Sequence, residues 1–109
     1  RECNQVVKGQ VRDSKTTALI PGATVVLFDK DGTELERTIV GDDAAFIFTV
    51  DCNKQYLARG SKEKYSTDEK RFETNQPLWQ ERYYSEEYTS ITFQFRQNDC
   101  ISLLSLFIN

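Results

Sequence analysis

The stretch ATVVLFDKDGTELERTIV, residues 23–40, carries the clearest indication of fold class in this chain. Its first part, residues 23–29, is rich in β-branched residues and almost entirely apolar, which is typical of a central strand buried on both faces. The run DKDG at residues 29–32 predicts a hairpin turn, because Gly32 can adopt a positive φ at little cost. Residues 33–40 alternate apolar and polar side chains and predict the returning strand. The stretch therefore predicts a β-hairpin.

Outward from this hairpin, strand patterns recur along the chain with turn residues between them. Residues 62–88 are dense in charge, and Pro77 argues against a continuous strand or helix there, so a long surface loop is expected around one short strand. Seven short strands joined by turns are typical of an all-β sandwich. The five further strands are predicted at residues 4–13, 45–50, 56–60, 71–74 and 90–97.

These patterns define one domain. We predict a seven-stranded antiparallel β-sandwich over residues 1–98 and a tail or linker to a neighbouring domain over residues 99–109. Within the tail, residues 100–109 fit a short strand or a helical turn equally. The chain opens with Arg1 and runs almost at once into strand-like sequence, so we expect it to be a piece of a longer protein, with any signal peptide or lipid anchor outside it.

The composition argues against most kinds of chemistry. The 109 residues include no histidine, so the sequence has no Ser-His-Asp or Cys-His machinery and no His-ligated zinc. A net charge of −3 does not favour binding to the phosphates of nucleic acids. The longest apolar run, residues 101–108, is too short to cross a bilayer, which needs about 20 helical residues. We expect a non-enzymatic domain with no cofactor, no metal ion and no membrane span in this fragment.

The three cysteines have no metal-ligand spacing and allow two interpretations. Cys3, Cys52 and Cys100 are either buried thiols of a cytosolic protein, or two of them form a disulfide in an oxidising compartment. We favour a disulfide between Cys3 and Cys52, because one precedes the first strand and the other follows a central strand. Closing a loop of this size would stabilise the domain by roughly 4 kcal/mol in the chain-entropy model. Cys100 has no assigned role.

Acidic residues gather in two places that could suggest a calcium site. Counted from Asp29, an EF-hand loop needs glycine at position 6 and glutamate at position 12, and this chain has neither. An ordinary hairpin turn is the better interpretation of that run. Asp42 and Asp43 beside Asp51 could still gather a weakly bound cation at one end of the sandwich.

Three segments, taken in chain order, resemble the motifs of a known family. Over residues 3–97 the chain resembles the carboxypeptidase regulatory-like domain, a transthyretin-like Greek-key sandwich of seven strands. Two glycines of the family pattern are absent, because Ala44 and Ala45 occupy one turn and Lys64 precedes Tyr65. The matching residues are Cys3, Gln5, Val6, Gly9 and Val11 in the first segment, Pro21, Gly22, Ala23, Thr24 and Val25 in the second, and Phe46, Ile47, Phe48, Cys52, Tyr56, Lys62 and Tyr65 in the third.

The resemblance carries expectations about function. The version with paired cysteines is similar to the module that precedes the OmpA-type peptidoglycan-binding domain in envelope proteins of Bacteroidetes, and residues 105–109 resemble the lead-in to that domain. It implies a non-catalytic spacer or docking module in the periplasm or at the outer membrane. The implied partners are neighbouring domains of the same chain and other envelope proteins, with a tether of type IX secretion machinery as one such context.

The run WQERYYSEEY, residues 79–88, is the strongest candidate for a binding surface. Tyrosine, tryptophan and arginine are the residues of interaction hot spots and of sugar-stacking platforms. They could equally cover the open side of a small core. The alternative function is therefore an independent carbohydrate- or protein-binding sandwich. Its candidate partner-binding residues are Trp79, Arg82, Tyr83, Tyr84 and Tyr88.

Overall fold

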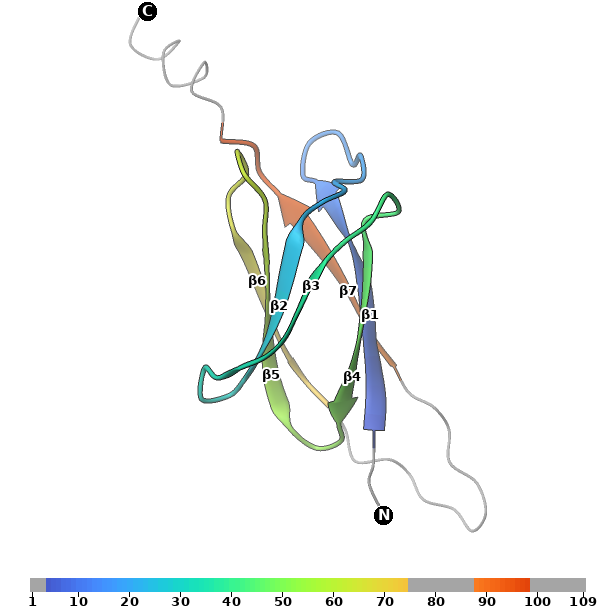
Figure 1. The fold of residues 1–109 in the computed structure, drawn as a ribbon, viewed down its shortest axis with the longest axis vertical. Helices are drawn as coiled ribbons and strands as arrows, with labels where there is room; N and C mark the ends of the chain where they lie inside the picture. The colour runs from blue at the N-terminus through green and yellow to red at the C-terminus, as the bar shows by residue number, and fades with distance from the viewer. Residues whose placement is uncertain (1–3, 75–87, 99–109) are drawn as a thin grey trace, which may run out of the picture.

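The computed structural model describes residues 4–74 and 88–98, which form two β-sheets packed face to face (Figure 1). The three-stranded sheet has the order β4-β1-β7, and the four-stranded sheet has the order β3-β2-β5-β6. The predicted seven-stranded sandwich is confirmed. The strands are β1 (Asn4–Asp13), β2 (Thr24–Asp29), β3 (Glu34–Ile39), β4 (Ala45–Asp51), β5 (Gln55–Ser61), β6 (Asp68–Glu73) and β7 (Tyr88–Phe95).

One ladder departs from the antiparallel pattern. The pairs β1–β4, β2–β3, β2–β5 and β5–β6 are antiparallel, whereas β1 and β7 run parallel from the Val6–Tyr88 pair to the Asp13–Phe95 pair. The first and last strands of the domain are thus neighbours that point the same way. In Figure 1, β1 begins at the lower end of the sandwich and β7 finishes at the upper end.

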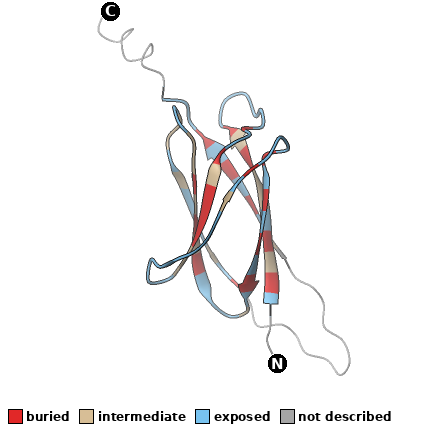
Figure 2. Ribbon diagram, in the orientation of Figure 1, coloured by how far each residue is buried: buried red, intermediate tan, exposed pale blue. Residues whose placement is uncertain are grey.

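The core lies between the sheets, where alternate residues of each strand point inward (Figure 2). On β4 the inward set is Phe46, Phe48 and Val50, as the alternation predicts, and the ring centroids of Phe46 and Phe48 are 5.7 Å apart. Strand β7 contributes Ile91, Phe93 and Phe95, all buried. Burial of these aromatic and branched side chains is the main force that holds the two sheets together.

The two strands of the β2–β3 hairpin differ in how far their apolar side chains are buried. On β2, Val25 and Leu27 face the core, and Val26 is also buried although it points to the outer face, so burial on both faces is confirmed. On β3, Leu35 and Ile39 remain 50% and 69% exposed. The alternation of β3 is real, but its apolar residues lie on the outside, because Arg37 of the same alternating set pairs with Val26, which points to the outer face of β2.

The hairpin turn after β2 is built around one carboxylate. Oδ1 of Asp29 accepts hydrogen bonds from the backbone N–H groups of Asp31 and Thr33, both at 2.9 Å. Gly32 has a φ of 88°, which is the left-handed conformation that glycine adopts without strain. The predicted turn is therefore confirmed, and the Asp29 carboxylate has a structural partner set.

A buried polar contact fixes the turn between β4 and β5. The hydroxyl of Thr74, which is 1% exposed, accepts a hydrogen bond from the Lys54 backbone N–H at 2.9 Å and donates one to the Asp51 carbonyl at 2.7 Å. The Tyr56 hydroxyl accepts from the Asp51 backbone N–H at 3.0 Å. These bonds connect the chain just after β6 to the start of β5, at one end of the sandwich.

Candidate functional site

The predicted aromatic surface falls mostly outside the described residues. Trp79, Arg82, Tyr83 and Tyr84 lie in the segment between β6 and β7 that the structure does not describe. Tyr88 is the first residue of β7 and pairs with Val6 of β1. The choice between core cover and partner surface therefore stays a prediction.

The structure describes one of the three cysteines. Cys52 is disulfide-bonded, whereas Cys3 and Cys100 lie outside the described residues. The β1–β4 register pairs Asn4 with Asp51, so one further step along both strands would set position 3 opposite position 52. This register favours Cys3 as the partner, and the pairing stays a prediction.

The prediction that Asp42, Asp43 and Asp51 could together bind a cation weakly is wrong. Asp42 and Asp43 precede β4, and Asp51 is its last residue, so the strand separates them by its full length. Asp43 instead accepts a hydrogen bond from the Ala45 backbone N–H at 3.1 Å. Within residues 4–74 and 88–98, no group of three or more His, Cys, Asp or Glu side chains could hold a metal ion.

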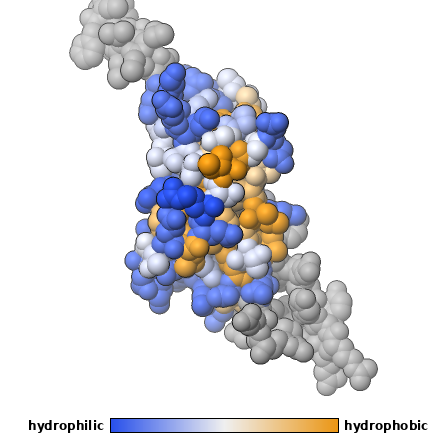
Figure 3. Space-filling view, in the orientation of Figure 1, coloured by the Kyte–Doolittle hydropathy of each residue, from blue (hydrophilic) through white to orange (hydrophobic). Residues whose placement is uncertain are grey.

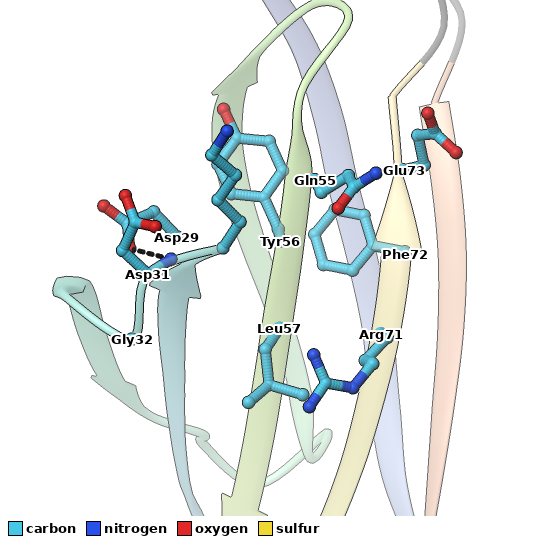
Figure 4. Close-up of a pocket in the computed structure, with 10 residues that line it drawn as sticks. Asp29, Asp31, Gly32, Gln55, Tyr56, Leu57, Arg71, Phe72 and Glu73 are labelled. Carbon is cyan, nitrogen blue, oxygen red and sulfur yellow. Dashed lines mark hydrogen bonds between the residues drawn. The ribbon is translucent and has the colours of Figure 1, made fainter.

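The described part of the chain has a hollow of about 520 Å³ beside the β2–β3 turn, lined by residues of that turn and of the paired strands β5 and β6 (Figure 4). Stacked rings of Tyr56 and Phe72, 5.5 Å apart, form one part of its lining. Arg71 reaches toward Leu57 on the neighbouring strand, with which it is in register. Asp31 and Gly32 close the hollow on the turn side.

The chemistry of this hollow suits a polar ligand rather than a reaction. Arg71 can donate several hydrogen bonds, and Asp31 and Glu73 can accept them, whereas Tyr56 is buried in the core and Phe72 packs against that core. The Asp29 carboxylate is occupied by its turn. The hollow therefore has groups for holding a ligand, and the sequence has no histidine to act there as a general base.

The outer face of the four-stranded sheet combines apolar and charged residues. The guanidinium of Arg59 lies 4.8 Å from the ring centroid of Phe28 and pairs with Glu69 at 2.8 Å. Arg37 pairs with Glu34 at 2.7 Å on the edge strand, and this hydrogen bond raises the pKa of Arg37 and lowers that of Glu34. Figure 3 shows hydrophobic patches beside strongly hydrophilic residues across the middle of the view.

The two ends of the described chain lie at opposite ends of the sandwich. Asn4 opens β1 at the end where β7 starts, and Phe95 closes β7 opposite Asp13, the last residue of β1. Beyond β7 the chain leaves the three-stranded sheet and contacts the β5–β6 connection, where the Asn98 backbone N–H donates to the Lys64 carbonyl at 2.8 Å.

No protein-family model matches this sequence, and no curated protein matches it. Solved structures share its fold. "The Bacillus anthracis TIE protein" matches with a TM-score of 0.67 and 13% identity over 87% of this chain and 18% of that one. BcpA, the major pilin subunit of Bacillus cereus, matches with a TM-score of 0.61 and 16% identity over 84% of this chain and 28% of that one.

An enzyme shares the same fold. Wild-type catechol 1,2-dioxygenase of Acinetobacter radioresistens matches with a TM-score of 0.66 and 8% identity over 91% of this chain and 53% of that one. This chain spans less than two thirds of each of these three proteins. Likeness at such low identity shows the fold alone, which is an immunoglobulin- or transthyretin-like β-sandwich.

Sequence reasoning missed the hollow and the Arg59–Phe28 contact. Both join residues of different strands, and their proximity depends on the pairing of β5 with β2 and β6. The DKDG turn is the sequence signal that could have indicated the hollow. Such a turn projects beyond the neighbouring strand, and its residues line the hollow here. Thr74 was included in a predicted strand, but its buried hydroxyl acts after the strand has ended.

No described helix is long and apolar enough to span a membrane.

Proposed function

We propose that this chain is a non-catalytic spacer or docking module of an exported envelope protein, of the carboxypeptidase regulatory-like kind. In this proposal it lies next to an OmpA-type peptidoglycan-binding domain, in the periplasm or at the outer membrane, and a type IX secretion tether is one such context. The observation that carries the proposal is the parallel pairing of β1 and β7. Because of it, the first strand begins at one end of the sandwich and the last strand finishes at the other.

Two further features support the proposal. A disulfide at Cys52 is expected of a protein that folds in an oxidising compartment such as the periplasm. The absence of histidine from the whole sequence removes the commonest general base and favours a domain that positions others. A fold shared by pilins and an enzyme does not by itself indicate a function, so the proposal depends on these local features.

The test is a domain replacement in the protein that contains this chain. One variant replaces residues 4–98 with an unrelated sandwich whose termini are equally far apart, and a second replaces them with a flexible Gly/Ser linker. A spacer predicts that the sandwich restores envelope attachment and the linker does not. A docking domain predicts that neither does. If deletion of the domain leaves attachment and assembly unchanged, the proposal is wrong.

The flanking sequence provides an independent check. We expect the open reading frame to encode a peptidoglycan-binding domain after residue 109. A peptidase domain before residue 1 would contradict the proposed architecture.

The second candidate function is a carbohydrate- or protein-binding sandwich. The observation that favours it is the position of the hollow, because Glu73 lines it and the chain passes from there into the segment that holds Trp79. Trp79→Ala and Arg71→Ala would each abolish binding to a glycan array if both regions contact one ligand. Exposed Lys70, next to Arg71 on β6, provides the matched control as Lys70→Ala. A glycan array without any hit would exclude the carbohydrate version.

A further inference from the structure

We infer that β1 and β7 form a mechanical clamp that resists force applied between the two ends of the domain. The inference deepens the proposed spacer function, because a spacer between two anchored neighbours transmits whatever force acts on them. Force that pulls Asn4 and Asn98 apart acts on β1 at its first residue and on β7 beyond its last residue. Since the two strands are parallel neighbours, that force slides them past each other along their length.

Sliding is the direction in which a β-ladder is strongest. The β1–β7 ladder has eight paired positions, from Val6–Tyr88 to Asp13–Phe95. In this direction all the hydrogen bonds of the ladder carry the force together, whereas a force that separates one end first breaks them one after another. A hydrogen bond from the Ser14 backbone N–H to the Phe95 carbonyl, at 2.8 Å, extends the contact past the last pair.

The surrounding structure holds each strand of the clamp in place. Strand β1 is the central strand of its sheet, and β4 pairs with it on the other edge from Asn4–Asp51 to Gln10–Ala45. On the inner side, Val7, Val11 and Phe93 are completely buried, so sliding must also expose apolar side chains to water.

The far end of β7 has a short clasp of its own. The Ser66 backbone N–H donates to the Arg96 carbonyl, and the Asn98 backbone N–H donates to the Lys64 carbonyl, both at 2.8 Å. Tyr65 forms a β-bridge with Gln97 between them. Residues 96–98 are therefore attached to the β5–β6 connection of the opposite sheet, and this clasp must release before the full force reaches β7.

The backbones of β1 and β7 approach closely at Gly9. A Cβ atom at this position would lie 1.8 Å from the Ile91 carbonyl oxygen and 2.8 Å from Cζ of Phe46. Only glycine permits this approach without displacing a backbone atom. Gly9 therefore supplies a substitution that separates the clamp strands, and Gly41, where the nearest atom is 3.9 Å from a Cβ, supplies its control.

Single-molecule force spectroscopy on the full 109-residue chain tests the clamp without changing its stability. In one geometry, handles are attached at the two termini, so that β1 and β7 slide. In the other, one handle is at the C-terminus and one on an azide-bearing residue that replaces exposed Lys15, next to the Ser14–Phe95 contact, so that the same ladder opens from one end. We expect several-fold higher rupture forces in the first geometry. Equal forces in the two geometries would overturn the clamp.

The variants test whether the ladder is the origin of the difference. Gly9→Ala should lower the rupture force between the termini toward that of the end-opening geometry, and Gly41→Ala should leave it unchanged. An unchanged force in Gly9→Ala would also overturn the clamp, and if that variant does not fold, the comparison of the two geometries in the unmodified chain decides. Equal rupture forces in the two geometries would contradict the clamp but not the spacer role, because a spacer needs only that its two ends be far apart. A domain replacement that fails to support the spacer role would not contradict the clamp.

Discussion

Gly9→Ala is the substitution that most directly tests the packing of the first strand against the last. The added methyl group would lie 1.8 Å from the Ile91 carbonyl oxygen, where an ordinary contact begins at 3.4 Å. The oxygen would have to move by about 1.6 Å, the difference between these two distances. Because it belongs to the backbone of β7, it cannot move alone, and the β1–β7 ladder must open locally.

The size of the effect follows from three terms. Overpacking costs about 1–3 kcal/mol, a weakened ladder hydrogen bond adds about 1 kcal/mol, and alanine returns about 0.5 kcal/mol by restricting the unfolded chain. We therefore expect Gly9→Ala to lower the free energy of unfolding by about 1.5–3.5 kcal/mol. For a domain of this size that corresponds to a decrease in Tm of roughly 6–14 °C.

Urea titration monitored by far-ultraviolet circular dichroism measures this change in the free energy of unfolding, and a thermal scan measures the change in Tm. Gly41→Ala is the control, because it meets nothing closer than 3.9 Å and should be neutral or stabilising by about 0.5 kcal/mol. If Gly9→Ala were as stable as Gly41→Ala, β1 and β7 could not approach each other as closely as Gly9 and Ile91 do in this structure, and the proposed clamp would be contradicted.

Three further predictions concern the polar contacts and the disulfide. Thr74→Val removes a buried hydroxyl with two backbone partners and should lower the free energy of unfolding by about 1–3 kcal/mol in urea, whereas Val at exposed Thr67 should be neutral. Hydrogen bonds from backbone N–H groups of the following turn lower the pKa of Asp13 below its ordinary value of 3.8. The ionised Asp13 carboxylate therefore stabilises the fold above pH 3.8, and this stabilisation is lost as the pH falls through the lower pKa of the folded state. Asp13→Asn should therefore weaken the pH dependence of stability in acid titrations, and an unaltered acid limb would refute this. Peptide mapping without reductant should find Cys52 linked to Cys3, and a link to any other cysteine would show that the β1–β4 register does not continue.

The sequence is informative wherever a structure depends on neighbours along the chain. The strands begin and end within a few residues of their predicted bounds, since alternation and turn residues are local signals. The turn at Asp29 is equally local, because its hydrogen bonds span only four residues. The inward sets of β4 and β7 follow from the period of two and the preference of phenylalanine for the core.

What the sequence could not predict depends on pairing between distant strands. The alternation of β3 does not reveal that Leu35 and Ile39 face outward, because that is decided by the register in which β3 pairs with β2. The parallel pairing of β1 with β7 joins segments about 80 residues apart, beyond the reach of local patterns.

The distance between the two ends of the sandwich in solution tests whether the domain can act as a spacer. Spin labels on azide-bearing residues at exposed positions 4 and 98 leave the cysteines untouched and allow double electron–electron resonance. The nine steps from Asn4 to Asp13, at about 3.3 Å each, span about 30 Å, and position 98 lies three residues beyond the Asp13–Phe95 pair, so we expect one narrow distribution centred at about 35–40 Å. A distance shorter than about half of that expected from strand geometry would place both ends on the same side of the domain and contradict its role as a spacer.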